Sequence, residues 1–129
     1  MTPAKNGHVE LVRRGFRLYA DGDFEGLWAL VHPDVELAPI FMPGTYRGLA
    51  AVRDALAGGG DPRLRWSASE LEFHEVGELV VVVGRLHARA VLGAPLNLPI
   101  AFVVHVRERL ITRMEGHMTL AQAVDAALD

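Results

Sequence analysis

The sequence predicts an α+β fold, in which helices come first and a run of antiparallel strands follows. In the N-terminal part, apolar residues recur at helical spacing, whereas after about residue 64 the chain alternates in extended runs separated by turn residues. Strands joined by tight turns pair as antiparallel neighbours, so this second part is expected to form a meander. With 129 residues, of which 50% are hydrophobic and 22% charged, the chain is expected to form one domain over residues 1–129.

The first helix is expected over Val9–Tyr19, because apolar residues recur there every three or four positions. This spacing turns Arg13, Arg14 and Arg17 toward solvent. Gly15 lies inside the helix at a cost of about 1 kcal/mol relative to alanine. Such a cost indicates that a neighbouring element packs closely against this position.

A tight corner and a second helix follow. Gly22 supplies the left-handed residue that ends the first helix, and Asp23 offers its carboxylate as the cap of a second helix over residues 24–31. Pro33 is expected to end that helix, because the residue before a proline favours an extended conformation. A strand is therefore expected at Val35–Leu37.

The remaining elements follow from turn residues and periodicity. An apolar loop with two prolines covers residues 39–44 and is expected to fold over a pocket or a partner surface, since exposed loops are rarely so apolar. A glycine-rich break is expected at residues 58–62. The expected strands cover about residues 64–75, 78–92, 99–107 and 110–118, and a short helix is expected within residues 119–128.

The helix, the Asp-Gly-Asp corner at residues 21–23, the short helix and the Pro-Asp step at residues 33–34 resemble the start of the nuclear-transport-factor-2-like superfamily. The nearest branch is the SnoaL-like group, and the resemblance extends over about residues 8–128. It implies a cone-shaped roll, in which a strongly curved antiparallel sheet wraps around the N-terminal helices and encloses a cavity. It also implies a third helix within Tyr46–Leu56 and a homodimer formed through the convex face of the sheet.

Relatives in this superfamily include ketosteroid isomerase, limonene epoxide hydrolase and polyketide cyclases, whose catalytic groups are largely absent here. The tyrosine and two aspartates of the isomerase fall on Gly15, Pro39 and Phe102. Of five polar groups in the epoxide hydrolase, only Arg85 is matched, and the cyclase aspartate falls near residues 118–119. The resemblance therefore implies a small-molecule pocket without assigning a reaction.

Three polar residues remain on the second long strand: Arg85, His87 and Arg89. If the turns are centred near residues 95 and 109, His87 shares a cross-strand layer with Val104 and Met114. The resemblance implies that this layer lies on the concave, ligand-facing side. Neighbouring cations would keep His87 neutral, so that it could act as a base while Arg85 stabilises negative charge. The alternative is that these residues form the polar side of a half-exposed sheet.

We therefore expect a SnoaL-like protein that binds a small apolar ligand in the cone, with its precise activity undefined. One alternative is an acid–base enzyme, with isomerase, polyketide-cyclase-like or epoxide-hydrolase-like chemistry, that uses His87 and Arg85. Another is a non-catalytic dimeric interaction module. The expected pocket wall comprises Phe16, Phe41, Met42, Arg89, Phe102, Val104, Met114 and Met118.

Composition narrows the other classes of function. A net charge of −3 gives no attraction to nucleic acid or to an anionic membrane, and no apolar run approaches membrane-spanning length, so a cytoplasmic protein is expected. The six histidines show no close spacing, and no phosphate loop or nucleotide fingerprint occurs, so neither a metal nor a cofactor is expected. Arg113, Glu115 and His117 share the convex face and are expected to form a network at a dimer or solvent surface.

Overall fold

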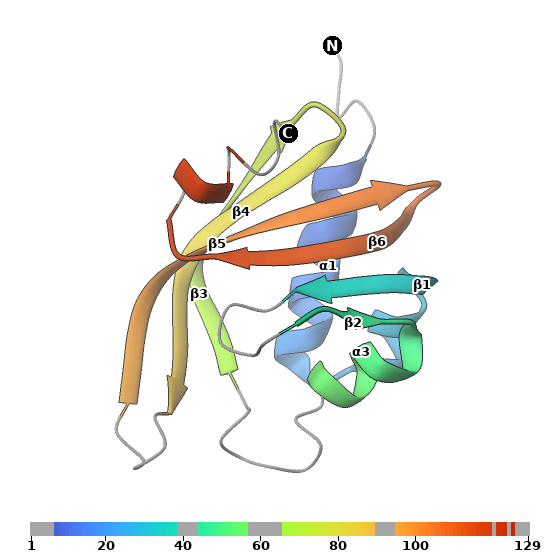
Figure 1. Ribbon diagram of the computed structural model, residues 1–129, viewed down its shortest axis with the longest axis horizontal. Coiled ribbons are helices and arrows are strands. Elements are labelled where there is room, and N and C mark those ends of the chain that lie inside the picture. Colours follow the sequence, from blue (N-terminus) through green and yellow to red (C-terminus); the bar gives the residue numbers. More distant parts are fainter. Residues whose placement is uncertain are drawn as a thin grey trace.

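The computed structural model describes residues 7–38, 44–56, 66–89, 95–119, 121–123 and 125. It confirms the α+β prediction: one curved sheet that does not close into a barrel has the helices on its concave side (Figure 1). Among these residues, no helix has the length and apolar character needed to cross a membrane. The elements are α1 (His8–Asp21), α2 (Phe24–Trp28), β1 (Val31–Ala38), β2 (Tyr46–Arg47), α3 (Leu49–Leu56), β3 (Trp66–Val76), β4 (Leu79–Arg89), β5 (Pro95–Arg107) and β6 (Leu110–His117).

The strand order is β2-β1-β6-β5-β4-β3. β3 to β6 form the predicted antiparallel meander, and β1 joins its β6 edge as a parallel neighbour. The short strand β2 then pairs with the other side of β1 and leads into α3. The glycine-rich break, and the expected apolar loop except for Gly44, lie outside the described residues.

The predicted corner between the first two helices is confirmed. Gly22 adopts φ 76°, and its N–H and that of Asp23 bond the carbonyls of Tyr19 and Leu18, which closes the end of α1. The Asp23 carboxylate accepts a hydrogen bond of 3.0 Å from the Gly26 N–H and so caps α2.

The end of the second helix differs from the prediction. α2 stops at Trp28, and β1 already begins at Val31, so Pro33 lies inside the strand rather than between helix and strand. The pairing of β1 with β6 shifts between Val31 and Glu36, and no ladder partner is assigned to Pro33. A proline is tolerated there because its missing N–H is not needed by the sheet.

The pairing of β4 with β5 also differs. His87 pairs with Asn97 and Arg85 with Pro99, each seven positions earlier in β5 than the expected partners. β5 begins at Pro95 rather than at residue 99, and Pro95 pairs with Arg89 of β4. An odd shift exchanges the two faces of a strand, so the layer predicted for His87 with Val104 is wrong.

The pairing of β5 with β6 largely follows the prediction. Val104 pairs with Met114 and Phe102 with Gly116, as expected. Val106 pairs with Ile111 instead of Thr112, because the register shifts by a bulge next to His105. The sequence therefore predicted two of the three β5–β6 layers, and the layer of Val106 with Thr112 is wrong.

Buried residues form apolar clusters on both faces of the sheet. On the concave face, α1 packs through its apolar side against β4 and β5, which alternate inward-facing valines, leucines and isoleucines. α2 and α3 cover β1 through a second cluster. On the convex face, Ala123 from the C-terminal segment is fully buried against Val81, Ala101 and Val103.

Candidate functional site

A cavity of about 70 Å³, called the apolar cavity below, lies between the helices and the concave face of β1, β5 and β6. Glu36 is the only charged residue among those described at its wall, and its carboxylate bonds Arg113, which belongs to a polar network described below. The wall comprises Gly15, Phe16, Tyr19, Leu27, Trp28, Val31, Val35, Glu36, Leu37, Val52, Val104, Ile111 and Met114.

Gly15 helps to keep this cavity open. A Cβ added at this buried position would lie 3.4 Å from Ile111 Cδ1 and 3.7 Å from Leu27 Cδ1. The close neighbour that the sequence predicted at Gly15 is therefore the pair of side-chain ends of Ile111 and Leu27. Because glycine has no side chain, the space between Gly15 and these two side-chain ends stays unfilled.

A second, larger cavity of about 280 Å³ lies between α1 and β3 and is called the α1–β3 cavity. Phe16 and Tyr19 line both cavities, so the two spaces are neighbours. The guanidinium of Arg13 lies over the Phe73 ring, 5.1 Å from its centroid. The described wall comprises Arg13, Phe16, Arg17, Tyr19, Ala20, Ala68, Leu71 and Phe73.

The residues predicted to line a pocket fall into several groups. Phe16, Val104 and Met114 line the apolar cavity. Phe102 is buried in the concave core, where its ring centroid lies 5.4 Å from that of Phe16. Met118 follows β6, is 40% exposed, and lines neither cavity. Residues 41 and 42 (Phe41 and Met42) and the side chain of residue 89 (Arg89) lie outside the described part of the chain.

His87 and Arg85 lie on the convex face, away from both cavities, because of the register of the β4–β5 hairpin. His87 Nε2 is 2.7 Å from the hydroxyl of Ser69. Arg85 donates from Nε to Asn97 Oδ1 at 2.6 Å and from Nη2 to the Asn97 carbonyl at 3.1 Å. Each of these polar groups therefore has a partner on a neighbouring strand.

The sequence placed Arg13 and Arg17 toward solvent, and Arg17 is exposed while Arg13 is partly exposed. The sequence did not predict that both residues border the α1–β3 cavity, whereas Arg14, which is also exposed, lines neither cavity. The available signal was their spacing: positions four apart on a helix project to the same side, next to Phe16.

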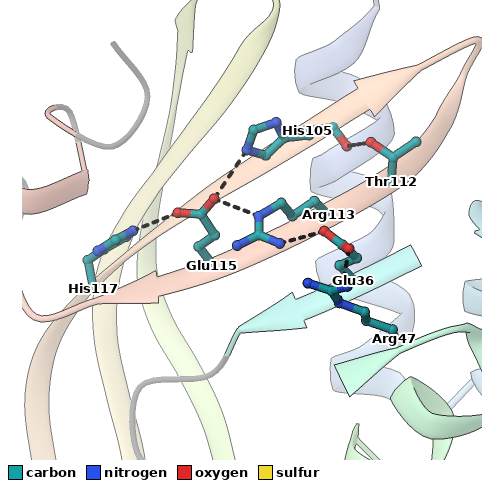
Figure 2. A network of polar contacts seen from close by, with 7 residues as sticks. All are labelled: Glu36, Arg47, His105, Thr112, Arg113, Glu115 and His117. Carbon is teal, nitrogen blue, oxygen red and sulfur yellow. Dashed lines mark hydrogen bonds and ion pairs between the residues drawn. The ribbon is translucent and has the colours of Figure 1, made fainter. Parts of the chain in front are cut away.

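The convex face carries a chain of ion pairs that crosses from β2 to β6 (Figure 2). Arg113 donates from Nε to Glu115 Oε2 at 2.8 Å and from Nη1 to Glu36 Oε1 at 2.6 Å. Arg47 Nε lies 3.3 Å from the second oxygen of Glu36. Arg113 is thus held between two carboxylates that come from different strands.

Two histidines complete this network, which we call the convex-face network. His117 Nε2 lies 3.2 Å from Glu115 Oε1, and His105 Nε2 lies 3.4 Å from Glu115 Oε2 (Figure 2). The predicted association of Arg113, Glu115 and His117 is therefore confirmed. Within the described ranges, no group of three or more His, Cys, Asp or Glu residues could hold a metal ion.

The network sets the charge of its central residues. Burial by itself would raise the pKa of Glu115, but hydrogen bonds from Arg113 and His117 and the nearby charges of Arg113 and His105 outweigh it and lower this pKa below 4.5. The hydrogen bond to Glu115 raises the pKa of Arg113, against an opposing effect of burial and with support from Glu36. Glu115 is therefore an anion at neutral pH.

Because the pKa of Glu115 is lowered in the folded protein, the free energy of unfolding depends on pH. The contribution of Glu115 is fully present above its ordinary pKa of 4.5 and is lost as pH falls through the lower folded-state pKa. We expect the free energy of unfolding to fall less steeply below pH 4.5 in Glu115→Gln than in the wild type. Urea denaturation between pH 7 and pH 3 measures this slope, and Glu108→Gln, at the exposed β5–β6 turn, is the control. Parallel slopes for wild type and Glu115→Gln would contradict the assigned pKa direction.

Comparison with known proteins adds to this geometry. The sequence pattern of the family described as SnoaL-like domain matches residues 12–114. No curated protein matches the chain.

Solved structures that resemble the chain share its fold. The structure of TerC co-crystallised with polyporic acid is 24% identical, with 96% of this chain and 100% of that chain covered and a TM-score of 0.76. An NTF2-like protein from Burkholderia xenovorans LB400 is 26% identical, with 92% and 94% covered and a TM-score of 0.73. RV0760c from Mycobacterium tuberculosis, in complex with estradiol-17β-hemisuccinate, is 20% identical, with 88% and 95% covered and a TM-score of 0.68.

Proposed function

The chain belongs to the SnoaL-like domain family, and from this premise we propose that it binds a small apolar molecule in the apolar cavity. The observation that carries the proposal is the chemistry of the wall. Its described residues are almost all aliphatic or aromatic, and none is a histidine, aspartate, lysine or arginine. Such a wall favours an apolar molecule through burial of apolar surface, and the carboxylate of its one described charged residue, Glu36, is bound by Arg113.

Two of the similar structures support the same class of function. TerC was co-crystallised with polyporic acid, and the Mycobacterium tuberculosis protein was solved with estradiol-17β-hemisuccinate. Both proteins have the same fold as this chain, with TM-scores of 0.76 and 0.68. A fold shared with ligand-bound proteins supports a ligand in this cone, although it assigns no particular molecule.

The placement of the polar residues favours binding over acid–base chemistry. A general base has to reach the reacting proton directly or through one water. His87 and Arg85 lie on the face of β4 opposite to the one that contacts α1. The homodimer through the convex face, and the alternative of an interaction module that uses this face, stay predictions.

Filling the apolar cavity is expected to abolish binding. Val104 is 1% exposed and lines the cavity from the middle of β5, so the ring of Val104→Phe would occupy the space of the ligand. We expect the affinity for the neutral fluorescent probe N-phenylnaphthylamine to fall at least about tenfold, or 1.4 kcal/mol. Fluorescence titration measures it, and circular dichroism shows that the variant is folded.

The control introduces a phenylalanine ring on the convex face of the sheet, away from the apolar cavity. Val83→Phe changes a half-buried residue of β4 that pairs with Ala101 on the convex side, and it should leave probe binding unchanged. If a folded Val104→Phe protein bound the probe as tightly as the wild type, or if the wild type did not bind it, the proposed function would be wrong.

A further inference from the structure

We propose that the natural ligand is an amphipathic anion, whose charged group is held by Arg17 and Arg13 at the α1–β3 cavity. The inference rests on the proposed function, because it names the class of molecule for the same site. Its apolar part would reach toward the apolar cavity, and a single negatively charged group, such as a carboxylate, would stay between α1 and β3.

The first support is the charge of the α1–β3 cavity. Arg13 and Arg17 are the only charged residues in its described wall. The β3 carboxylate Glu72 pairs across the strands with Val83, on the convex face, and its closest ionic partner is His74 on the same side. The cavity is therefore a positive site without a carboxylate in its own described wall.

The second support is the state of the two guanidinium groups. Arg17 is exposed and forms no ion pair and no hydrogen bond with any described residue, so its donors are available to a ligand. Arg13 bonds Glu10, which takes up part of its charge, and lies on the Phe73 ring. Stacking on a ring fixes the position of a guanidinium while leaving some of its N–H groups free for an anion.

The third support is that the two cavities are neighbours. Phe16 and Tyr19 line both of them, so a ligand in one cavity lies against side chains that also border the other. The apolar cavity alone, at about 70 Å³, is much smaller than the pockets of about 300–1,000 Å³ that hold typical ligands. The neighbouring α1–β3 cavity, at about 280 Å³, adds space for a larger ligand, and Arg13 and Arg17 lie in its wall.

Helix α1 also shows that the arginines at the cavity differ from their neighbour. Arg14 lies between them in sequence and is exposed like Arg17, but it lines neither cavity. If arginine were merely common on the surface of α1, substitution of each of the three arginines would have the same effect on anion binding. The proposal makes Arg17 and Arg13 important for anion binding and leaves Arg14 without effect.

The experiment compares two probes that differ in one charge. Anilinonaphthalene sulfonate carries a sulfonate on the ring system of N-phenylnaphthylamine, which is neutral. We expect Arg17→Gln to weaken binding of the anionic probe about tenfold, and Arg13→Gln with Arg17→Gln to weaken it further, because a hydrogen bond to a charged group is lost. Binding of the neutral probe should be unchanged in both variants, and Arg14→Gln should affect neither probe.

Two further measurements locate the charged probe. Affinity for the anionic probe should fall with added salt, whereas that of the neutral probe should not. Val104→Phe should weaken both probes if the body of the ligand enters the apolar cavity. A sulfonate probe that bound equally well to wild type and to the double variant, that lost as much affinity in Arg14→Gln, or that ignored Val104→Phe, would overturn the inference.

These outcomes also separate the inference from the proposed function. If the neutral probe binds and Val104→Phe removes it, the cavity binds apolar molecules whatever happens to the sulfonate. If the neutral probe does not bind the wild type, the proposed function fails, and the inference fails with it.

Discussion

Gly84→Ala is expected to lower the free energy of unfolding by about 2–4 kcal/mol, although it adds only one methyl group. A Cβ at Gly84 would lie 2.7 Å from the carbonyl oxygen of Ser69 and 2.7 Å from Leu71 Cδ2. The leucine end can rotate away, but the carbonyl belongs to the backbone of β3. Relief of the clash therefore requires the two strands to separate.

The local geometry of β3 explains this close approach. The pairing of β3 with β4 shifts between Ser69 and Glu72, and within this bulge Glu70 adopts φ 55°. A bulge bends its strand and disrupts the ladder locally, and glycine is the residue that tolerates the close approach of another backbone. Gly84 is paired with Ile100 on its other side, so β4 cannot simply move outward.

Gly15→Ala is the matched control for this prediction. Its added Cβ would meet only side-chain ends, at 3.4 Å and 3.7 Å, which are ordinary contact distances. Alanine also favours a helix interior over glycine by about 1 kcal/mol, so Gly15→Ala should leave stability unchanged or raise it by up to that amount. Guanidinium chloride denaturation of both variants measures the contrast. A Gly84→Ala protein as stable as the wild type would show that the bulge adjusts freely.

The sequence predicted the features that depend on neighbouring residues. Gly22 and Asp23 act within one turn of chain, and the short turn between β5 and β6 leaves little choice of register, so Val104 pairs with Met114 as expected. The face of His87 depended on the length of the loop between β4 and β5. Because strand faces alternate with every residue, an error of an odd number of positions reversed the assignment.

The candidate site was harder to predict, because it depends on contacts between distant parts of the chain. Phe16, Val104 and Met114 were found, since apolar residues at regular spacing face the core. Arg17 is exposed, as predicted, but its place beside a cavity was not predicted, because only the packing of α1 beside β3 creates that cavity. No local sequence pattern in either segment predicts how α1 and β3 pack beside each other.

Arg113→Met is expected to lower the free energy of unfolding by about 2–3 kcal/mol at neutral pH, because two charge-assisted hydrogen bonds are lost. Glu115 and Glu36 have side-chain exposures of 17% and 32%, so their charges would be left in a partly dehydrated place. His117, His105 and Arg47 remain near the two carboxylates, which limits the loss. Thermal or urea denaturation of the variant at pH 7 measures it.

Arg47→Met is the control, because it removes a cation from the same network at its exposed end. Arg47 is 75% exposed and lies 3.3 Å from Glu36, so its loss should cost less than about 0.5 kcal/mol. The pH dependence gives a second check. Without Arg113, burial raises the pKa of Glu115 and favours the neutral acid, so the stability gap to the wild type should narrow as pH falls below 4.5. Equal, small losses in both variants would mean that solvent screens the whole network, and that its half-buried geometry contributes little to the fold.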